Sequence, residues 1–142
     1  MNVKNVELGG LHLKLQSLKG LILDGDVALA IVDLKDQISV KLNQTEKAMT
    51  DVAESFSLKG EGGIPVKETQ QTEHGMYVSY KFATPQAEAK CQEELFKISS
   101  AESVLSIMPS SISKEAISKL KCTSDQVEAL LILVAKPTLE KV

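Results

Sequence analysis

The stretch DVALAIVDLKDQISVKLNQTEKAMTDVAESFSLK, residues 26–59, decides the fold that this chain is expected to adopt. Apolar side chains recur along it every three, four or seven residues, and neither glycine nor proline interrupts it. This periodicity predicts one long amphipathic helix over residues 26–59. Asp24-Gly25-Asp26 supplies its N-cap and places negative charge at the positive end of the helix dipole. The apolar positions are Val27, Ile31, Leu34, Ile38, Leu42, Met49, Val52 and Phe56.

The length of this helix indicates an interface. At about 1.5 Å per residue the helix would be roughly 45 Å long, whereas a compact domain of this size is only about 30 Å across. Part of the helix should therefore project, fold back on a partner helix, or pack against another copy of the chain. The apolar stripe passes through the polar Thr45, which weakens the case for a continuous coiled coil. The residues expected at the interface are Ile38, Leu42, Met49, Val52 and Phe56.

A β-hairpin is predicted over residues 64–82, after the glycines of Gly60-Glu61-Gly62-Gly63 end the helix. Pro65 confines the first strand to a sheet edge, because proline has no amide hydrogen to donate. A polar turn from Gln70 to Gly75 separates the two strands. One face of the second strand carries Met76, Val78, Tyr80 and Phe82, and the other carries Tyr77, Ser79 and Lys81.

Helix-capping signals predict a cluster of short helices over residues 84–136. The signals are Thr84-Pro85, Ser99 with Glu102, Ser111 or Ser113, and Thr123 with Gln126. The helix that begins at Ser99 should run to Pro109, and the last helix should stop before Pro137.

The N-terminal segment fits two patterns equally well. Alternating leucines at 11, 13 and 15 suit a strand, and leucines at 11, 15 and 18 with Ile22 suit one helix face. We favour a short strand from Val3, a break at Gly9-Gly10, and a helix over residues 11–19. The fold class expected for the whole chain is α+β, mainly helical, in a single domain over residues 1–142.

Composition and motifs argue against several function classes. The formal net charge is −3, and all 16 basic residues are lysine, which argues against nucleic-acid binding. The sequence has no long apolar run and no signal pattern, so we expect a cytoplasmic protein with no membrane segment. No metal-ligand spacing, phosphate-binding loop or nucleophile motif occurs. We therefore expect no enzyme activity, no cofactor and no metal.

Three residues of the predicted hairpin are candidate contacts for a ligand or a partner protein. His74 lies in the predicted turn, where a recognition contact is well placed. Tyr77 should be exposed beside Lys81, whereas Tyr80 should belong to the core. An exposed tyrosine in a chain with so few aromatic residues can stack on a base or anchor a protein contact.

The general plan resembles small uncharacterised proteins of bacteriophages and prophages. The similar features are the leucine-rich opening LHLKLQSL at residues 11–18, the step Leu23-Asp24-Gly25, the long helix rich in lysine and leucine, and a short capped helix that closes the chain. The resemblance carries no catalytic residues. It implies a protein of the host cytoplasm that serves in virion assembly or inhibits a host or defence component.

Two hypotheses follow from the sequence. The first is a non-enzymatic, self-associating interaction protein, a homo-oligomer that also binds a host or phage protein. The alternative is an oligomeric small-ligand binder that sequesters a nucleotide-type signal, with His74, Tyr77 and Lys81 lining its pocket.

Overall fold

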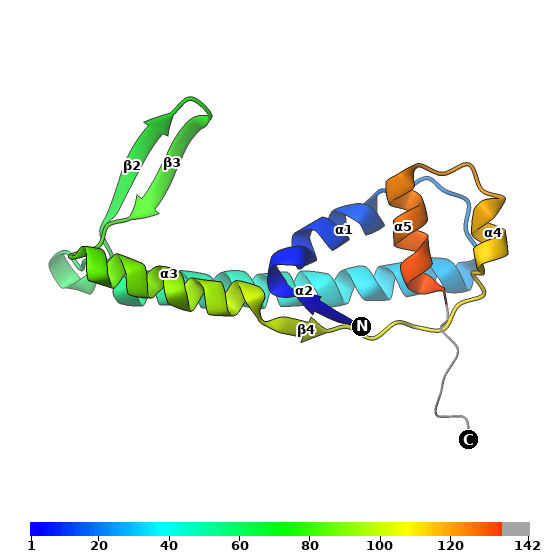
Figure 1. The fold of residues 1–142 in the computed structure, drawn as a ribbon, viewed down its shortest axis with the longest axis horizontal. Helices are drawn as coiled ribbons and strands as arrows, with labels where there is room; N and C mark the ends of the chain where they lie inside the picture. Colours follow the sequence, from blue (N-terminus) through cyan, green and yellow to red (C-terminus); the bar gives the residue numbers. More distant parts are fainter. Residues whose placement is uncertain (135–142) are drawn as a thin grey trace, which may run out of the picture. The chain divides into compact units, whose positions relative to one another are not determined.

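The computed structural model describes residues 1–134 and has an α+β, mainly helical fold, as predicted (Figure 1). Within these residues the strands form two antiparallel pairs, β1 with β4 and β2 with β3. The elements are β1 (Asn2–Lys4), η1 (Asn5–Glu7), α1 (Leu8–Gln16), α2 (Gly25–Phe56), η2 (Glu61–Gly63), β2 (Lys67–Thr72), β3 (Gly75–Tyr80), α3 (Pro85–Ser100), β4 (Glu102–Val104), α4 (Lys114–Ser118) and α5 (Ser124–Leu133).

Backbone contacts divide the chain into two compact units. Unit 1 comprises Met1–Leu42 and Glu102–Val142, and unit 2 comprises Asn43–Ala101. The first part of α2 belongs to unit 1 and the second part to unit 2. The single domain expected over residues 1–142 stays a prediction.

The long helix is confirmed as α2, which has 32 residues. It begins one residue before the predicted range and ends at Phe56, three residues before the predicted end. At its end the carbonyl of Glu54 accepts two side-chain hydrogen bonds, one from the Ser57 hydroxyl at 2.8 Å and one from the Lys59 ammonium. The backbone of Leu58 is then free to bond to the carbonyl of Lys81 at 2.7 Å.

Unit 1 is built around a core of large aliphatic side chains. Those less than 2% exposed are Leu8, Leu15, Val27, Leu34, Ile38, Leu105, Leu130 and Leu133. Within the unit α1 packs against α5, and β1 pairs with β4 so that Val3 lies opposite Ser103. Burying each such side chain contributes about 1.5–3 kcal/mol.

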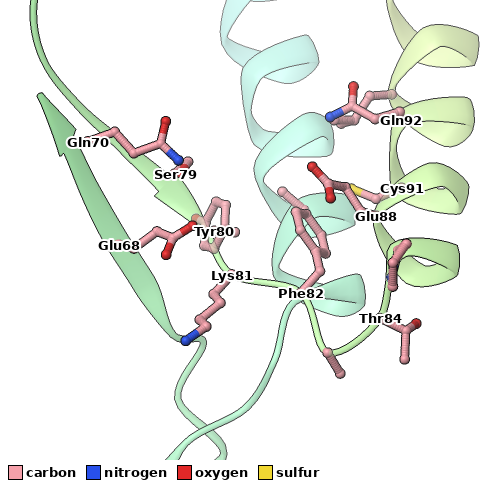
Figure 2. Close-up of a pocket in the computed structure, with 14 residues that line it drawn as sticks. Glu68, Gln70, Ser79, Tyr80, Lys81, Phe82, Thr84, Glu88, Cys91 and Gln92 are labelled. Carbon is pink, nitrogen blue, oxygen red and sulfur yellow. The ribbon is translucent and has the colours of Figure 1, made fainter. Parts of the chain in front are cut away.

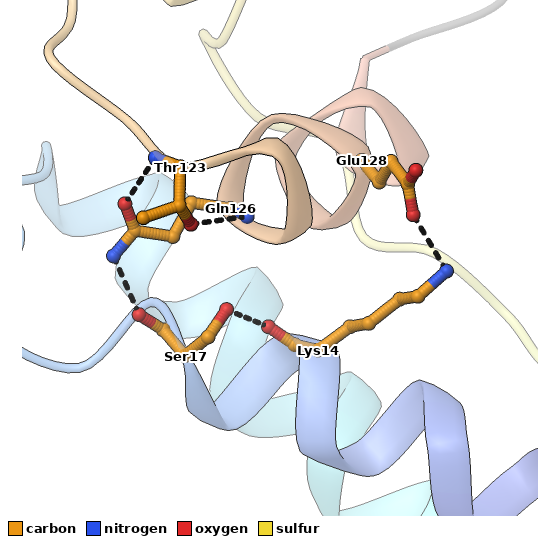
Figure 3. A network of polar contacts seen from close by, with 5 residues as sticks. All are labelled: Lys14, Ser17, Thr123, Gln126 and Glu128. Atoms are coloured by element: carbon orange, nitrogen blue, oxygen red, sulfur yellow. Dashed lines mark hydrogen bonds and ion pairs between the residues drawn. The ribbon is translucent and has the colours of Figure 1, made fainter.

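Polar contacts join α1 to α5 at the surface of this core (Figure 3). The ammonium of Lys14 lies 2.6 Å from the carboxylate of Glu128. The predicted capping box is present, since the Thr123 amide donates to the Gln126 side chain at 2.9 Å and the Gln126 amide donates to the Thr123 hydroxyl at 3.2 Å. The Gln126 side chain also donates to the carbonyl of Ser17 at 2.7 Å.

The N-terminal prediction is wrong in its boundaries. The helix is α1, Leu8–Gln16, so Gly9 and Gly10 lie inside it and do not break it. Two glycines cost a helix about 0.5–1 kcal/mol each. Burial of Leu8, Leu11 and Leu15 on one face of α1 outweighs that cost.

The helix predicted from Ser99 to Pro109 is absent from the described residues. The hydroxyls of Ser99 and Ser100 donate back to the carbonyl of Phe96, at 3.1 and 2.7 Å, so α3 continues through both serines. Residues 102–104 then form β4 because β1 offers them a strand to pair with. Ser113 caps α4, whereas Ser111 bonds to Asp26. The last helix, α5, ends at Leu133 and so stops before Pro137, as predicted.

Candidate interaction surface on the β2–β3 hairpin

The hairpin of unit 2 has a short turn. β2 and β3 pair from Lys67↔Tyr80 to Thr72↔Gly75, which leaves Glu73 and His74 in the turn. Gly75 has a φ of 121°, a conformation that favours glycine. The Thr72 hydroxyl accepts a hydrogen bond from the amide of His74 at 3.3 Å. The turn is shorter than predicted because the polar residues Gln70 to Thr72 continue the strand.

Three segments meet at the base of the hairpin. The amide of Val66 donates to the carbonyl of Leu58 at 2.8 Å, and the amide of Lys81 donates to the carbonyl of Val66 at 2.9 Å. The amide of Gly60 donates to the carbonyl of Ile64 at 2.8 Å. Residues 64–66 are therefore engaged with the chain that follows α2, and the first strand begins at Lys67 rather than at residue 64.

The hairpin is open to solvent over most of its length. Every residue of β2 is exposed, and so is every residue of β3 except Tyr80, which is half-buried. Met76 is 70% exposed, Val78 66% and Tyr77 52%. Tyr77 is exposed as predicted. On the face shared by Met76, Val78, Tyr80 and Phe82, the first two side chains are exposed and the last two are half-buried.

Tyr80 fastens the hairpin to α2. Its hydroxyl donates to Oε1 of Glu54 at 3.2 Å, and the ammonium of Lys67 lies 5.1 Å from the centre of its ring. Partial burial, followed by the bond to Glu54, raises the pKa of the Tyr80 hydroxyl. This hydroxyl therefore remains protonated at neutral pH and continues to donate to Glu54.

A cavity of about 510 Å³ lies in unit 2 between the hairpin and α3 (Figure 2). Its charged lining residues are Glu68, Glu88 and Lys81. In Figure 2 the Phe82 ring points toward the helices, whereas the Lys81 side chain points away from them. The remaining lining residues are Ala53, Gln70, Ser79, Tyr80, Phe82, Ala83, Thr84, Pro85, Cys91, Gln92 and Leu95.

Cys91 lies at the wall of this cavity and is fully buried. Burial, followed by the nearby charge of Glu88, raises the pKa of its thiol. A protonated thiol is a poor nucleophile. Both Cys91 and Cys122 are free thiols.

The structure separates the residues that the sequence proposed as contacts. Lys81 lines the cavity, whereas His74 and Tyr77 do not. On α2, Ile38 is fully buried in the core of unit 1, so it offers no surface to a partner. Leu42 packs against that core, and three further predicted interface residues are half-buried on the part of α2 in unit 2: Met49, Val52 and Phe56.

Sequence reasoning missed that the hairpin leaves Met76 and Val78 uncovered. The signal was present in β2, whose sequence KETQQT contains no apolar residue. An apolar face on β3 therefore has no apolar neighbour across the hairpin, since Val78 lies opposite Thr69 and Met76 opposite Gln71.

Two other features are absent from the residues that the structure describes. Nowhere in residues 1–134 do three or more His, Cys, Asp or Glu side chains gather in a way that could hold a metal ion. Over the same residues, no helix combines the length and apolar character needed to cross a membrane. Comparison of the chain with protein-family models, curated proteins and solved structures gives no significant match.

Proposed function

We propose that this chain is a non-enzymatic, self-associating interaction protein whose association surface lies in unit 2. The observation that carries this proposal is the exposure of the β2–β3 hairpin, with Met76 and Val78 on the surface. An isolated two-stranded hairpin is marginally stable in water. Its free edges and exposed apolar side chains favour pairing with another chain.

The small core of unit 2 supports the same proposal. The buried residues of Asn43–Ala101 are Ala53, Ser57 and Cys91, all with small side chains. Such a unit gains little stability from its own burial. A protein that covers the hairpin would supply burial that unit 2 lacks.

The biological role proposed for this association comes from the resemblance to small bacteriophage and prophage proteins. The chain would act in the host cytoplasm, either in virion assembly or as an inhibitor of a host or defence component. Its self-association would present several copies of unit 2 to that host or phage protein, which strengthens binding by multivalency.

The proposal is tested by sedimentation velocity on the full chain over a wide range of concentration. Wild type is expected to form a dimer or a larger oligomer. Val78→Lys places a charge on the hairpin and is expected to give a monomer. The control Val6→Lys changes a valine of unit 1 that is 69% exposed, compared with 66% for Val78. This control should sediment as wild type does. Wild-type protein that stays monomeric at the highest concentration would contradict self-association.

The half-buried part of α2 offers a second test of the same proposal. Val52→Asp is expected to dissociate the oligomer, because it places a carboxylate among the side chains of unit 2, while the C-terminal helices of unit 1 stay folded. Circular dichroism and sedimentation on one sample measure both effects. Loss of all folded structure in Val52→Asp would contradict this division of roles between the units.

A second candidate function is the binding of a small nucleotide-type ligand in unit 2. The cavity of about 510 Å³ favours it, because ligand pockets measure about 300–1,000 Å³. Lys81 could bind a phosphate, but Glu68 and Glu88 would repel it. A rise in melting temperature with a nucleotide, lost in Lys81→Gln, would support this function. The absence of any shift across a nucleotide panel would argue strongly against it.

A further inference from the structure

The two edges of the hairpin differ in their capacity to pair. The backbone N–H and C=O groups of both Val66 and Lys81 point into the hairpin, since they bond to one another and to Leu58. Successive residues of an antiparallel strand point these groups to alternate sides. On the outer edge of β3 the groups that point outward therefore belong to Met76, Val78 and Tyr80.

The outer edge of β2 carries features that oppose pairing. By the same alternation its outward positions begin at Pro65, which has no amide hydrogen, and continue at Lys67. Proline and lysine on an edge strand are both known to prevent pairing with other chains. The stretch Gly75–Tyr80 has neither a charge nor a proline, and it is rich in residues that favour strands.

We propose that two copies of this chain pair through the outer edge of β3, antiparallel and centred on Val78, to form a four-stranded sheet. This inference rests on the proposed self-association and names its surface. In this register Val78 lies opposite the copy's own Val78, and Met76 lies opposite the copy's Tyr80. Every outward-facing N–H and C=O group of Met76, Val78 and Tyr80 then has a partner.

Side-chain chemistry favours the same register. Residues directly opposite in an antiparallel pair point to the same face. The exposed Met76 and Val78 would then contact the apolar side chains of the copy on one continuous face. A shift by one residue would place them on opposite faces of the sheet.

The charges next to β3 favour an antiparallel arrangement, and they favour a second copy of this chain as the partner of the β3 edge. β3 is followed by Lys81, and the turn before it carries Glu73. In the proposed register Lys81 lies opposite Gly75 of the copy and diagonally beside the copy's Glu73, and the same contact recurs at the other end. A parallel pair would place Lys81 beside Lys81 and Glu73 beside Glu73, which is unfavourable.

Disulfide trapping of the full chain tests the pairing. The variant Val78→Cys is made together with Cys122→Ser, while the buried Cys91 stays in place. Opposed residues in an antiparallel pair have Cα atoms about 4.5–5.5 Å apart, within the range of about 4.4–6.8 Å that a disulfide spans. Under mild oxidation Val78→Cys is expected to form a covalent dimer, read by non-reducing electrophoresis and intact mass.

The matched control is Thr69→Cys in the same background, because Thr69 lies opposite Val78 within the hairpin and occupies the centre of the β2 edge. Val78→Cys should cross-link on the order of a hundredfold faster, since a dimer holds the two thiols at millimolar effective concentration. A mixture of Tyr77→Cys and Ser79→Cys, whose residues are opposed in this register, should give mainly the mixed dimer.

The outcomes separate this inference from the proposed function. If wild type self-associates in sedimentation but Val78→Cys cross-links no faster than Thr69→Cys, pairing through β3 is wrong and self-association stands with another surface. Faster cross-linking of Thr69→Cys would assign the interface to β2 and also overturn the inference. Wild type that is monomeric at every concentration would contradict both proposals.

Discussion

Unit 1 and unit 2 differ in the size of the side chains that they bury. Unit 1 buries large aliphatic side chains such as Leu15, Leu34 and Leu130, each 1% exposed or less. The buried residues of unit 2 are Ala53, Ser57 and Cys91. Because the stabilisation from burial scales with apolar area, unit 1 contributes most of the chain's own stability. Both units leave apolar side chains exposed, but unit 2 buries no large side chain of its own and would therefore gain more from being covered by another protein.

The largest expected effect that would test this difference concerns two leucines of α1. Leu15 is 1% exposed and Leu13 is 68% exposed. Leu15→Ala should lower the free energy of unfolding by about 2–5 kcal/mol, because it leaves a cavity in the core of unit 1. Leu13→Ala should change it by less than about 0.5 kcal/mol. Urea denaturation followed by circular dichroism measures both, and equal losses would contradict the assignment of the core.

Two threonine caps provide an intermediate effect and compare the units directly. Thr123 caps α5 in unit 1, and Thr84 caps α3 in unit 2, where its hydroxyl accepts from the Ala87 amide at 3.1 Å. Thr123→Ala should lower the free energy of global unfolding by about 1 kcal/mol. Thr84→Ala should instead weaken the hydrogen-exchange protection of α3, with little change in the main unfolding transition. Equal changes in that transition would show that the two units unfold cooperatively.

The smallest expected effect is a pH dependence within unit 1. Partial desolvation alone would raise the pKa of Asp26, but hydrogen bonds from Ser111 and the Val27 amide outweigh it and lower that pKa. A carboxyl whose pKa is lower in the folded state contributes stability above its unfolded pKa. That contribution is lost as the pH falls through the folded pKa.

Melting temperature therefore should fall as the pH drops from about 5 toward 2, and part of this fall should be absent in Asp26→Asn. The control Asp36→Asn changes an exposed residue of the same helix and should keep the wild-type pH dependence. An identical pH profile for wild type and Asp26→Asn would contradict a role for the contact with Ser111.

The sequence predicts best those elements whose signals are local. The repeat of apolar residues predicts α2, and hydroxyl caps predict the starts of α3 and α5 at Thr84 and Thr123. The cap of α4 is Ser113, one of the two serines that the sequence offers for it. β4 escapes prediction because its partner strand, β1, is distant in the sequence. No sequence pattern within residues 102–104 indicates that β1 lies close enough to pair with them.

The candidate site was predicted only in part. The hairpin and the exposure of Tyr77 follow from alternation along β3. The exposure of Val78 depends on what the rest of the chain leaves uncovered, which periodicity along one strand does not report. For Ile38 the error is the reverse, because a buried residue was predicted to be an interface residue. Its place on the apolar stripe of α2 suggests an interface, but its side chain is buried in the core of unit 1.

The pairing of β1 with β4 has a consequence for the order of events during synthesis. Val3 lies opposite Ser103, so the first strand emerges from the ribosome long before its partner. At about 5–20 residues per second, the interval is roughly 5–20 s. All of Asn43–Ala101 is translated within that time, before unit 1 can close. Unit 2 is therefore synthesised in full before unit 1 receives the strand that completes its β1–β4 pair.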